Sequence, residues 1–403
     1  MTATRRQPTL SDRLARPFQR FLAIEAASTI LLLLATVLAL AWANSPWRES
    51  YTTLWHTKLG IRLGGAELAL TLEHWVNDGL MALFFFLVGM EIKHEIAHGE
   101  LSSRGRAMLP VFGALGGMLA PAAIYAAFHA SGPAASGWGV PMATDIAFAV
   151  AALAVFGPRV PPGLKVFLLA LAIVDDLGAV TVIALFYTHG LSLPALAAAG
   201  GGLAFVWGMQ RSGVRAYLPY WLAGAVVWLA TLESGIHATV AGVVLGLLTP
   251  TGSRHVDAPS PVEFLTKALH PWVAFAVMPI FALANAGIVL EADALADPLA
   301  PRVMLAVALG LLVGKPVGIT LLSWLAVRAG IATLPSGVGW TALLGAGCLG
   351  GIGFTMALFI TALAFQDPAL AAASKIGVMA ASVLATAGGL LVLGRALPRA
   401  SRS

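Results

Sequence analysis

The stretch from Lys165 to Tyr187 constrains this chain most, because it is long and apolar and yet carries two adjacent carboxylates. About 20 apolar residues, at ~1.5 Å rise per residue, cross the hydrocarbon core of a bilayer. The stretch therefore predicts a membrane-spanning helix with Asp175 and Asp176 near its middle. Because each charged side chain there costs about 2.5–3.5 kcal/mol, both acids are candidates for a functional site.

The composition extends this interpretation to the whole chain. Of its 403 residues, 59% are hydrophobic and only 11% are charged, whereas soluble domains carry about 25% charged residues. The net charge of +5 is not gathered in a basic stripe, so nucleic acid is not an expected partner. The single cysteine, Cys348, allows neither a disulfide framework nor a cysteine metal cluster. We expect a polytopic, all-α membrane protein without a cofactor.

Apolar runs punctuated by Pro, Gly and charged residues recur along the chain and predict twelve transmembrane helices. They form one membrane domain, residues 21–396, between an N-terminal tail, 1–20, and a C-terminal tail, 397–403. The twelve runs lie at about 21–43, 72–97, 107–129, 139–156, 164–188, 194–209, 217–232, 236–250, 263–289, 302–327, 341–364 and 373–396.

The positive charges predict the orientation of these helices. Seventeen of the 24 Lys and Arg residues fall in the two tails and in the loops on their side, and five fall on the opposite side. Because cytoplasmic segments are enriched in Lys and Arg, both termini are expected in the cytoplasm. The N-terminal tail lacks the features of a cleaved secretory signal, so the first span is expected to stay uncleaved.

The largest external loop predicts a β-hairpin at about residues 57–70. Apolar residues alternate there on either side of a Gly64-Gly65 pair. Because a lone two-stranded hairpin is marginal in water, it is expected to pair with its copy in a homodimer. Packing against its own loop is the alternative.

Two spans are interrupted. The fourth contains Gly139 and Pro141 ahead of Thr144-Asp145, and the eleventh contains the glycine-rich run 349–354. Unpaired backbone at membrane depth is tolerated only where it lines a cavity or is buried in protein. Each interrupted span is the middle of a three-span group, 107–188 and 302–396. This favours an inverted repeat with an ion site near the membrane midplane, because interrupted spans in matching positions mark the binding sites of transporters. The family that the motifs below resemble is itself a standard example of that rule.

The ionisable residues deep within spans must be hydrated, paired with one another or neutralised by protons. Their insertion would together cost about 12–18 kcal/mol if they were unpaired. Neighbouring residues on a helix are turned ~100° apart, so Asp175 and Asp176 cannot share one partner, and Lys315 is the natural partner of one of them. Carboxylates with the Thr144 hydroxyl suit a small hard cation. The alternative is a network that only fixes helix register. The ionisable residues concerned are Asp78, Asp145, Asp175, Asp176 and Lys315.

Five motifs in this order resemble the NhaA-type bacterial sodium/proton antiporters, and the resemblance runs from about residue 18 to 396. Any one of them alone would be weak, and together they are specific. The motifs are Ala143-Thr144-Asp145-Ile-Ala-Phe, Ala-Leu-Ala-Ile-Val-Asp175-Asp176-Leu-Gly-Ala, Ser234-Gly-Ile-His237-Ala-Thr, Gly314-Lys315-Pro316 and Gly350-Gly-Ile-Gly353-Phe-Thr355.

The resemblance implies a role for each matching residue. Asp176 would ligate Na⁺ or Li⁺ with help from Asp175, and Asp175 would pair with Lys315. Asp145 would balance the facing ends of the two interrupted helices, with Thr144 beside the ion. The implied activity is exchange of cytoplasmic sodium for external protons in the bacterial inner membrane, for sodium extrusion and pH regulation. Preference among Na⁺, Li⁺ and K⁺ and the proton stoichiometry stay open.

The chain departs from the family pattern at two helix ends. His94 stands between Glu91 and Glu95 where the family commonly has arginine. Near the start of the ninth span, Thr266 and Lys267 stand where some members carry an acid and a histidine, ahead of a retained His270.

A pH-sensitive cluster is expected from these ends, because His titrates near ~6.5. Its candidate members are Glu91, Glu95, His270 and the more distant His237. The alternative is a solvated helix end for the first three and a simple hydrogen-bonded contact for His237.

One motif favours an enzyme instead. His94-Glu95-Ile-Ala-His98 fits H-E-x-x-H, in which two histidines at i and i+4 hold zinc beside a general base. The match lies at a polar helix end, and no third ligand stands in a persuasive context. An aspartyl intramembrane protease lacks its Gly-x-Gly-Asp motif, and a passive channel does not need acids paired with a lysine. We therefore expect a secondary transporter and not an enzyme.

Overall fold

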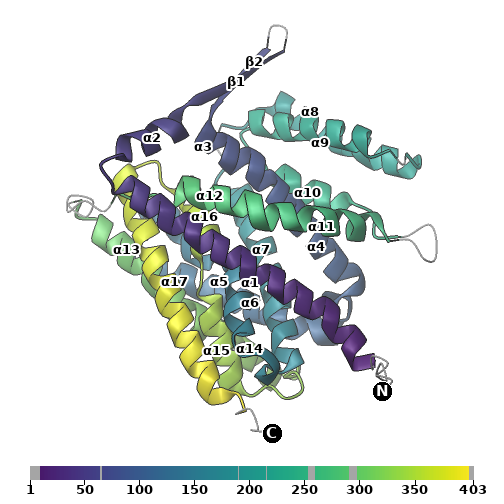
Figure 1. The fold of residues 1–403 in the computed structure, drawn as a ribbon, viewed down its shortest axis with the longest axis vertical. Helices are drawn as coiled ribbons and strands as arrows, with labels where there is room; N and C mark the ends of the chain where they lie inside the picture. The colour runs from purple at the N-terminus through teal and green to yellow at the C-terminus, as the bar shows by residue number, and fades with distance from the viewer. Residues whose placement is uncertain are drawn as a thin grey trace, which may run out of the picture.

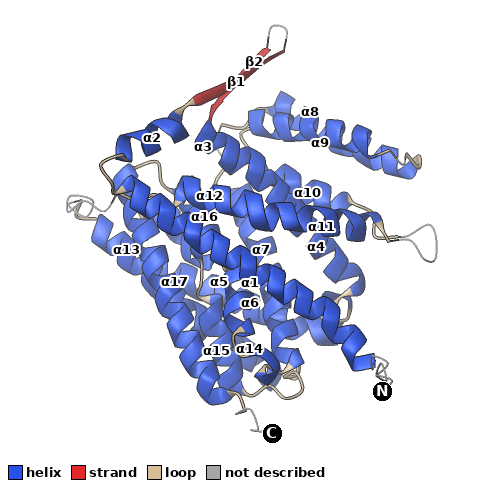
Figure 2. Ribbon diagram, in the orientation of Figure 1, coloured by secondary structure: helices blue, strands red, loops and turns tan. Residues whose placement is uncertain are grey.

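The computed structural model describes residues 10–63, 66–188, 190–214, 216–252, 259–289 and 297–398. The described residues form helices joined by loops, together with one two-stranded sheet (Figure 2). By length and composition, eight of these helices can cross a membrane, or ten if each of two sharply bent pairs is one span. The expectation of an all-α, multi-pass membrane protein is confirmed at this level.

The first half of the chain carries the hairpin and the first interrupted span. Its elements are α1 (Leu10–Ala43), α2 (Arg48–His56), β1 (Lys58–Leu63), β2 (Ala66–Thr71), α3 (Leu72–His74), η1 (Trp75–Leu80), α4 (Met81–His98), η2 (Glu100–Ser102), α5 (Arg104–Phe128), η3 (Ala135–Met142), α6 (Ile146–Ala154), η4 (Gly157–Arg159) and α7 (Pro162–Phe186).

The second half begins with a helical pair that stands at the side of the molecule (Figure 1). Its elements are α8 (Leu193–Arg211), α9 (Tyr217–Glu233), α10 (Thr239–Leu248), α11 (Pro261–Trp272), η5 (Val273–Val277), α12 (Met278–Asn285), α13 (Ala300–Leu309), η7 (Gly310–Gly314), α14 (Lys315–Arg328), α15 (Trp340–Gly350), α16 (Phe354–Ala364) and α17 (Pro368–Ala396).

The two ends of the described chain and the hairpin lie on opposite sides of the molecule. Strands β1 and β2 pair antiparallel, with Lys58 opposite Thr71 and Leu63 opposite Ala66. Helix α1 begins and α17 ends on the side away from these strands (Figure 1). Helix α1 begins at Leu10, within the segment predicted as a tail, and α2 turns away from it by 113°.

Within the described residues, three spans contain a widened, π-helical turn that the sequence pattern did not predict. These turns are η1, η5 and η7. The last two each end two residues before a proline, Pro279 and Pro316. A proline ring clashes with the carbonyl four residues earlier in a regular α-helix, and a wider turn relieves that clash. In this way α14 starts at Lys315 without breaking its span.

The contacts between helices divide most of them into two groups. Bundle A consists of α5, η3 with α6, α7, α13 with α14, α15 with α16, and α17. Bundle B consists of η1 with α4, α8, α9, α10, and α11 with α12. Helix α1 packs on both groups, against α6 and α12, while α4 and α10 contact α7 across the boundary.

Glycines allow the closest helix crossing in bundle A, between α5 and α14. A methyl group on Gly116 would overlap the carbonyl group of Gly318, and a methyl group on Gly318 would overlap that of Gly116. Small residues of this kind let backbones approach in membranes, where no hydrophobic effect drives helices together. The contact holds α14, and with it Lys315, against α5.

Replacement of Gly116 by alanine is therefore expected to destabilise the protein, by about 1–3 kcal/mol, because the new methyl group forces two backbones apart. The matched control is Gly200→Ala in α8, where the methyl group would meet open space. That change is expected to be neutral or stabilising, because alanine favours a helix over glycine by about 1 kcal/mol. Thermal unfolding in detergent, followed by tryptophan fluorescence, measures both. Equal midpoints for the two variants would contradict the close crossing.

Candidate ion-binding site

The two interrupted spans meet at their breaks. The fourth span is extended at residues 143–145, between η3 and α6, and the eleventh turns by 46° between α15 and α16. The backbone N–H of Asp145 donates to the carbonyl of Ile352 at 2.7 Å, and the Thr144 hydroxyl donates to that of Gly350 at 2.8 Å. Each break thus supplies hydrogen-bond partners that the other lacks.

The Asp145 carboxylate joins the starts of two helices. Its Oδ1 accepts from the N–H of Phe148 and caps α6. Its Oδ2 accepts from both the N–H and the hydroxyl of Thr355 in the first turn of α16. A helix N-terminus carries a partial positive charge of roughly half an elementary charge. The single negative charge of Asp145 therefore stabilises two such ends, which face each other in the membrane.

Lys315 forms the central ion pair of the site. Its Nζ lies 2.7 Å from Oδ2 of Asp175 and donates a second hydrogen bond to the Thr144 hydroxyl at 2.8 Å. The lysine is 0% exposed and Asp175 is 1% exposed. A buried pair of this kind is stable only when its geometry is good and further hydrogen bonds are made. Lys315 satisfies both conditions with partners from two other spans.

Asp176 lies beside this pair without a comparable partner. It is 1% exposed, and its Oδ1 is buried without a hydrogen-bond partner among the described residues. The negative charges of Asp175, Asp145 and Glu91 act on it, opposed by the positive charge of Lys315. An isolated buried carboxylate is costly unless it takes up a proton or a cation. An oxygen donor of this kind, among negative charges, fits a small hard cation.

The residues predicted for pH regulation are spread more widely. Glu91 and Glu95 lie one turn apart on α4, and His270 lies on α11, which packs against α4. Glu95 accepts a hydrogen bond from the N–H of Glu100, so its carboxylate turns toward the loop after α4. Of these acids, Glu91 is the one whose charge acts on Asp176.

His237 belongs to a different cluster that the sequence did not predict. Its Nε2 lies 3.2 Å from Oδ1 of Asp78 in η1, and its Nδ1 is 2.8 Å from the Thr239 hydroxyl. Trp228 donates its indole N–H to the backbone carbonyl of Asp78. The sequence singled out Asp78 for its position within a span and His237 for its motif, but it did not predict that the two side chains meet. His237 therefore has hydrogen-bond and charge partners close by, as expected for a histidine that makes a structural contact between helices.

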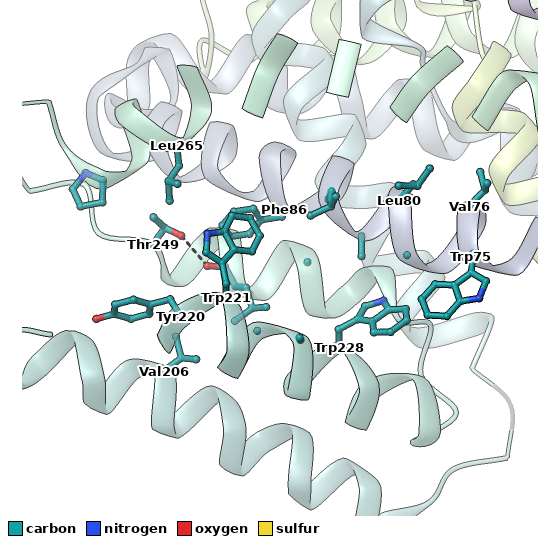
Figure 3. A pocket seen from close by; sticks show the side chains of 18 of the residues that line it. Trp75, Val76, Leu80, Phe86, Val206, Tyr220, Trp221, Trp228, Thr249 and Leu265 are labelled. Atoms are coloured by element: carbon teal, nitrogen blue, oxygen red, sulfur yellow. Dashed lines mark hydrogen bonds between the residues drawn. The ribbon is translucent and has the colours of Figure 1, made fainter. Parts of the chain in front are cut away.

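A large apolar cavity lies apart from the carboxylates. It has a volume of about 1020 Å³ and separates α8 and α9 from α4, α10 and α11. Trp75, Phe86, Trp221 and Trp228 are among its lining residues, and Figure 3 shows their side chains around it. None of Asp145, Asp175 and Asp176 lines it. This apolar space is therefore separate from the candidate ion-binding carboxylates.

Within the described residues, no three or more His, Cys, Asp or Glu side chains are grouped so as to hold a metal ion. Among these described residues, the H-E-x-x-H match at His94 therefore has no third ligand of the kind that a catalytic zinc requires. A buried carboxylate with an unsatisfied oxygen lies instead beside a buried lysine, where two interrupted spans cross. This arrangement is typical of secondary ion transporters.

Comparison with known proteins identifies the family. The profile described as Na⁺/H⁺ antiporter 1 matches residues 19–393. The Na(+)/H(+) antiporter NhaA 2 of Myxococcus xanthus is 50% identical, over 98% of this chain and 93% of that protein. The NhaA antiporters of Acidovorax sp. and Rhodopirellula baltica are 50% and 46% identical, over 96% and 97% of this chain and 95% and 96% of their own lengths.

The chain thus belongs to the Na⁺/H⁺ antiporter 1 family, and it is a transporter rather than an enzyme. The resemblance drawn from its sequence motifs is confirmed.

Replacement of Lys315 by methionine is expected to destabilise the protein by about 3–5 kcal/mol, because it leaves the buried Asp175 carboxylate unpaired. The double variant Lys315→Met with Asp175→Asn is expected to recover much of that loss, because both charges are then removed. Arg328→Met, which removes an exposed cation from the other end of α14, is the control. Thermal unfolding in detergent measures all three. A double variant no more stable than Lys315→Met would argue against the pair.

Proposed function

We propose that this antiporter exchanges cytoplasmic Na⁺ or Li⁺ for external protons across the bacterial inner membrane, and so extrudes sodium and regulates internal pH. Family membership supports sodium/proton antiport, and the similar proteins are named Na(+)/H(+) antiporters. The observation that carries the site assignment is the buried Asp176 carboxylate, whose Oδ1 has no protein partner among the described residues.

The proposed roles follow from the contacts. Asp176 binds the cation, with Asp175 beside it and the Thr144 hydroxyl next to the Lys315–Asp175 pair. Lys315 holds Asp175 in its paired state while the site is empty. Asp145 keeps the two helix ends together and adds negative charge near the ion. Protons and sodium ions compete for the same carboxylates, and this competition alone produces exchange.

Alternating access is proposed to come from movement of bundle A against bundle B, as in other transporters with a midplane site. Support comes from the membership of bundle A, which contains Thr144, Asp145, Asp175, Asp176 and Lys315. The site would therefore move as one unit between the two faces of the membrane.

We also propose the finer topology of the family for this chain. It has twelve spans in residues 21–396, with an inverted repeat of 107–188 and 302–396 and with both tails, 1–20 and 397–403, in the cytoplasm. Two shorter apolar helices, in α9 and α10, supplement the eight to ten candidate spans and support the number twelve. The start of α1 and the end of α17 on one side support the orientation (Figure 1).

The hairpin of β1 and β2 is proposed to join two copies in a homodimer. Support comes from its position beyond the helices (Figure 1), where its outer edges have no strand neighbour among the described residues. Native mass spectrometry of the solubilised protein tests this, and a monomer would contradict it.

Regulation by pH is proposed to involve Glu91 and Glu95 near the cytoplasmic end of α4, His270 in the last turn of α11, and His237 on the external side. Support is strongest for Glu91, because its charge acts on Asp176.

Sodium-driven proton flux in everted membrane vesicles tests the site. The Asp176→Asn variant is expected to lose this flux, because an amide carries no negative charge to bind the ion or to exchange with a proton. Asp367→Asn is the matched control, because Asp367 caps α17 away from the site and asparagine caps a helix equally well. Unchanged flux in Asp176→Asn, at normal membrane abundance, would contradict the assignment.

In the same assay, the apparent KM for Na⁺ is expected to depend on pH. A carboxylate must be deprotonated to bind sodium, so the apparent KM for Na⁺ is expected to rise as the pH falls. Where a single proton competes with the ion, the rise approaches about tenfold per pH unit. The maximal rate at saturating Na⁺ should change less. A KM independent of pH, with a falling maximal rate, would indicate regulation at a distance instead of competition.

A further inference from the structure

We infer that His94 and His98 form a binding site for a divalent transition metal ion that prefers imidazole, such as Zn²⁺ or Ni²⁺. The two histidines belong to the H-E-x-x-H match, which the transport function leaves unexplained. They lie on the last two turns of α4, at i and i+4, so both rings project from one face of the helix. Nothing in this inference depends on the assignment of the ion-binding aspartates.

The distance between the two rings suits a shared ion. Their centroids are 5.5 Å apart and their planes are tilted by 37°. Two imidazoles that bind one zinc ion at Zn–N distances of about 2.0–2.1 Å, in tetrahedral geometry, have centroids about 5 Å apart. Small side-chain rotations therefore bring both rings to one metal ion, without movement of the helix.

The charges around the pair also favour a cation. His98 is the last residue of α4, and the C-terminal end of a helix carries a partial negative charge. The carboxylate of Glu263, in the first turn of α11, interacts electrostatically with both imidazoles. Glu263 is held in place by a capping box with Ser260, in which each side chain accepts from the other residue's backbone N–H.

The site would be open and labile. His98 is exposed and His94 is partly exposed. The described residues group no third His, Cys, Asp or Glu with the two histidines, so the proposed site rests on these two ligands. Glu95, which a metalloprotease would use as its general base, accepts a hydrogen bond from the N–H of Glu100. The chemistry therefore points to reversible binding and not to catalysis.

Isothermal titration of Zn²⁺ into the purified full chain, in detergent and with any histidine tag removed, tests the site. One Zn²⁺ per chain is expected at pH 7.5. His94→Gln and His98→Gln should each weaken binding at least about tenfold, as losses around metal ligands do. His56→Gln, which changes an exposed histidine on α2, is the matched control and should bind as the wild type does.

Two further measurements separate this site from unspecific binding. Glu263→Gln should weaken Zn²⁺ binding by a smaller factor, because it removes a neighbouring charge and no ligand. At pH 5.5 binding should be lost, because protonated imidazole cannot bind a metal ion. Thermal unfolding midpoints equal to the wild type would show that the variants fold. Absence of binding by the wild type, or unchanged binding in folded His94→Gln or His98→Gln, would overturn the proposal.

Discussion

The ion pair between Lys315 and Asp175 is the interaction on which the centre of this membrane protein depends. Removal of two such charges from water costs several kcal/mol for each ion, and only close pairing with additional hydrogen bonds offsets that cost. Lys315 meets the requirement with partners 140 and 171 positions earlier in the chain, Asp175 and Thr144. Three separate spans must therefore approach one another closely. The widened turn η7, which precedes Pro316, and the glycine crossing of α5 with α14 make that approach possible.

The second constraint is the backbone of the two interrupted spans. Polar backbone groups cannot remain unpaired in a membrane interior, so an interruption must be satisfied by protein or must line a cavity. Here the extended residues 143–145 supply donors to the carbonyls of Gly350 and Ile352, and the carboxylate of Asp145 accepts from the first turns of α6 and α16. The interruptions thus stabilise each other. They also leave Thr144 between Lys315 and the second break. Its hydroxyl accepts a hydrogen bond from Lys315 and donates one to the carbonyl of Gly350.

Much of this arrangement could be predicted from sequence, because the membrane makes charges and interruptions conspicuous. A lysine deep in a span needs an acidic partner, because an unpaired buried charge is costly. Gly139 with Pro141 predicts a break in the helix independently of the rest of the fold. Helix geometry alone could not tell which of Asp175 and Asp176 faces Lys315, since that depends on how α7 is rotated against α14. Only the family resemblance pointed to Asp175. The pairing of Asp78 with His237 and the contact of Asp145 with Thr355 also depend on tertiary packing. The turns η5 and η7 were detectable in principle from Pro279 and Pro316, whereas η1 has no such marker.

The division into two bundles gives the site a mechanical property. The hydrogen bonds described at the site, from Lys315 to Asp175 and Thr144 and from Thr355 to Asp145, join residues of bundle A. Across the boundary, the ring of Phe359 in bundle A packs against Phe85 and Phe281 of bundle B. Ring contacts of this kind are each worth only about 0.5–1.5 kcal/mol beyond the area they bury. A displacement between the bundles would therefore exchange weak, non-directional contacts and leave the charged network intact. The buried charged contacts, which would cost most to break, lie within bundle A, where a displacement between the bundles does not separate them.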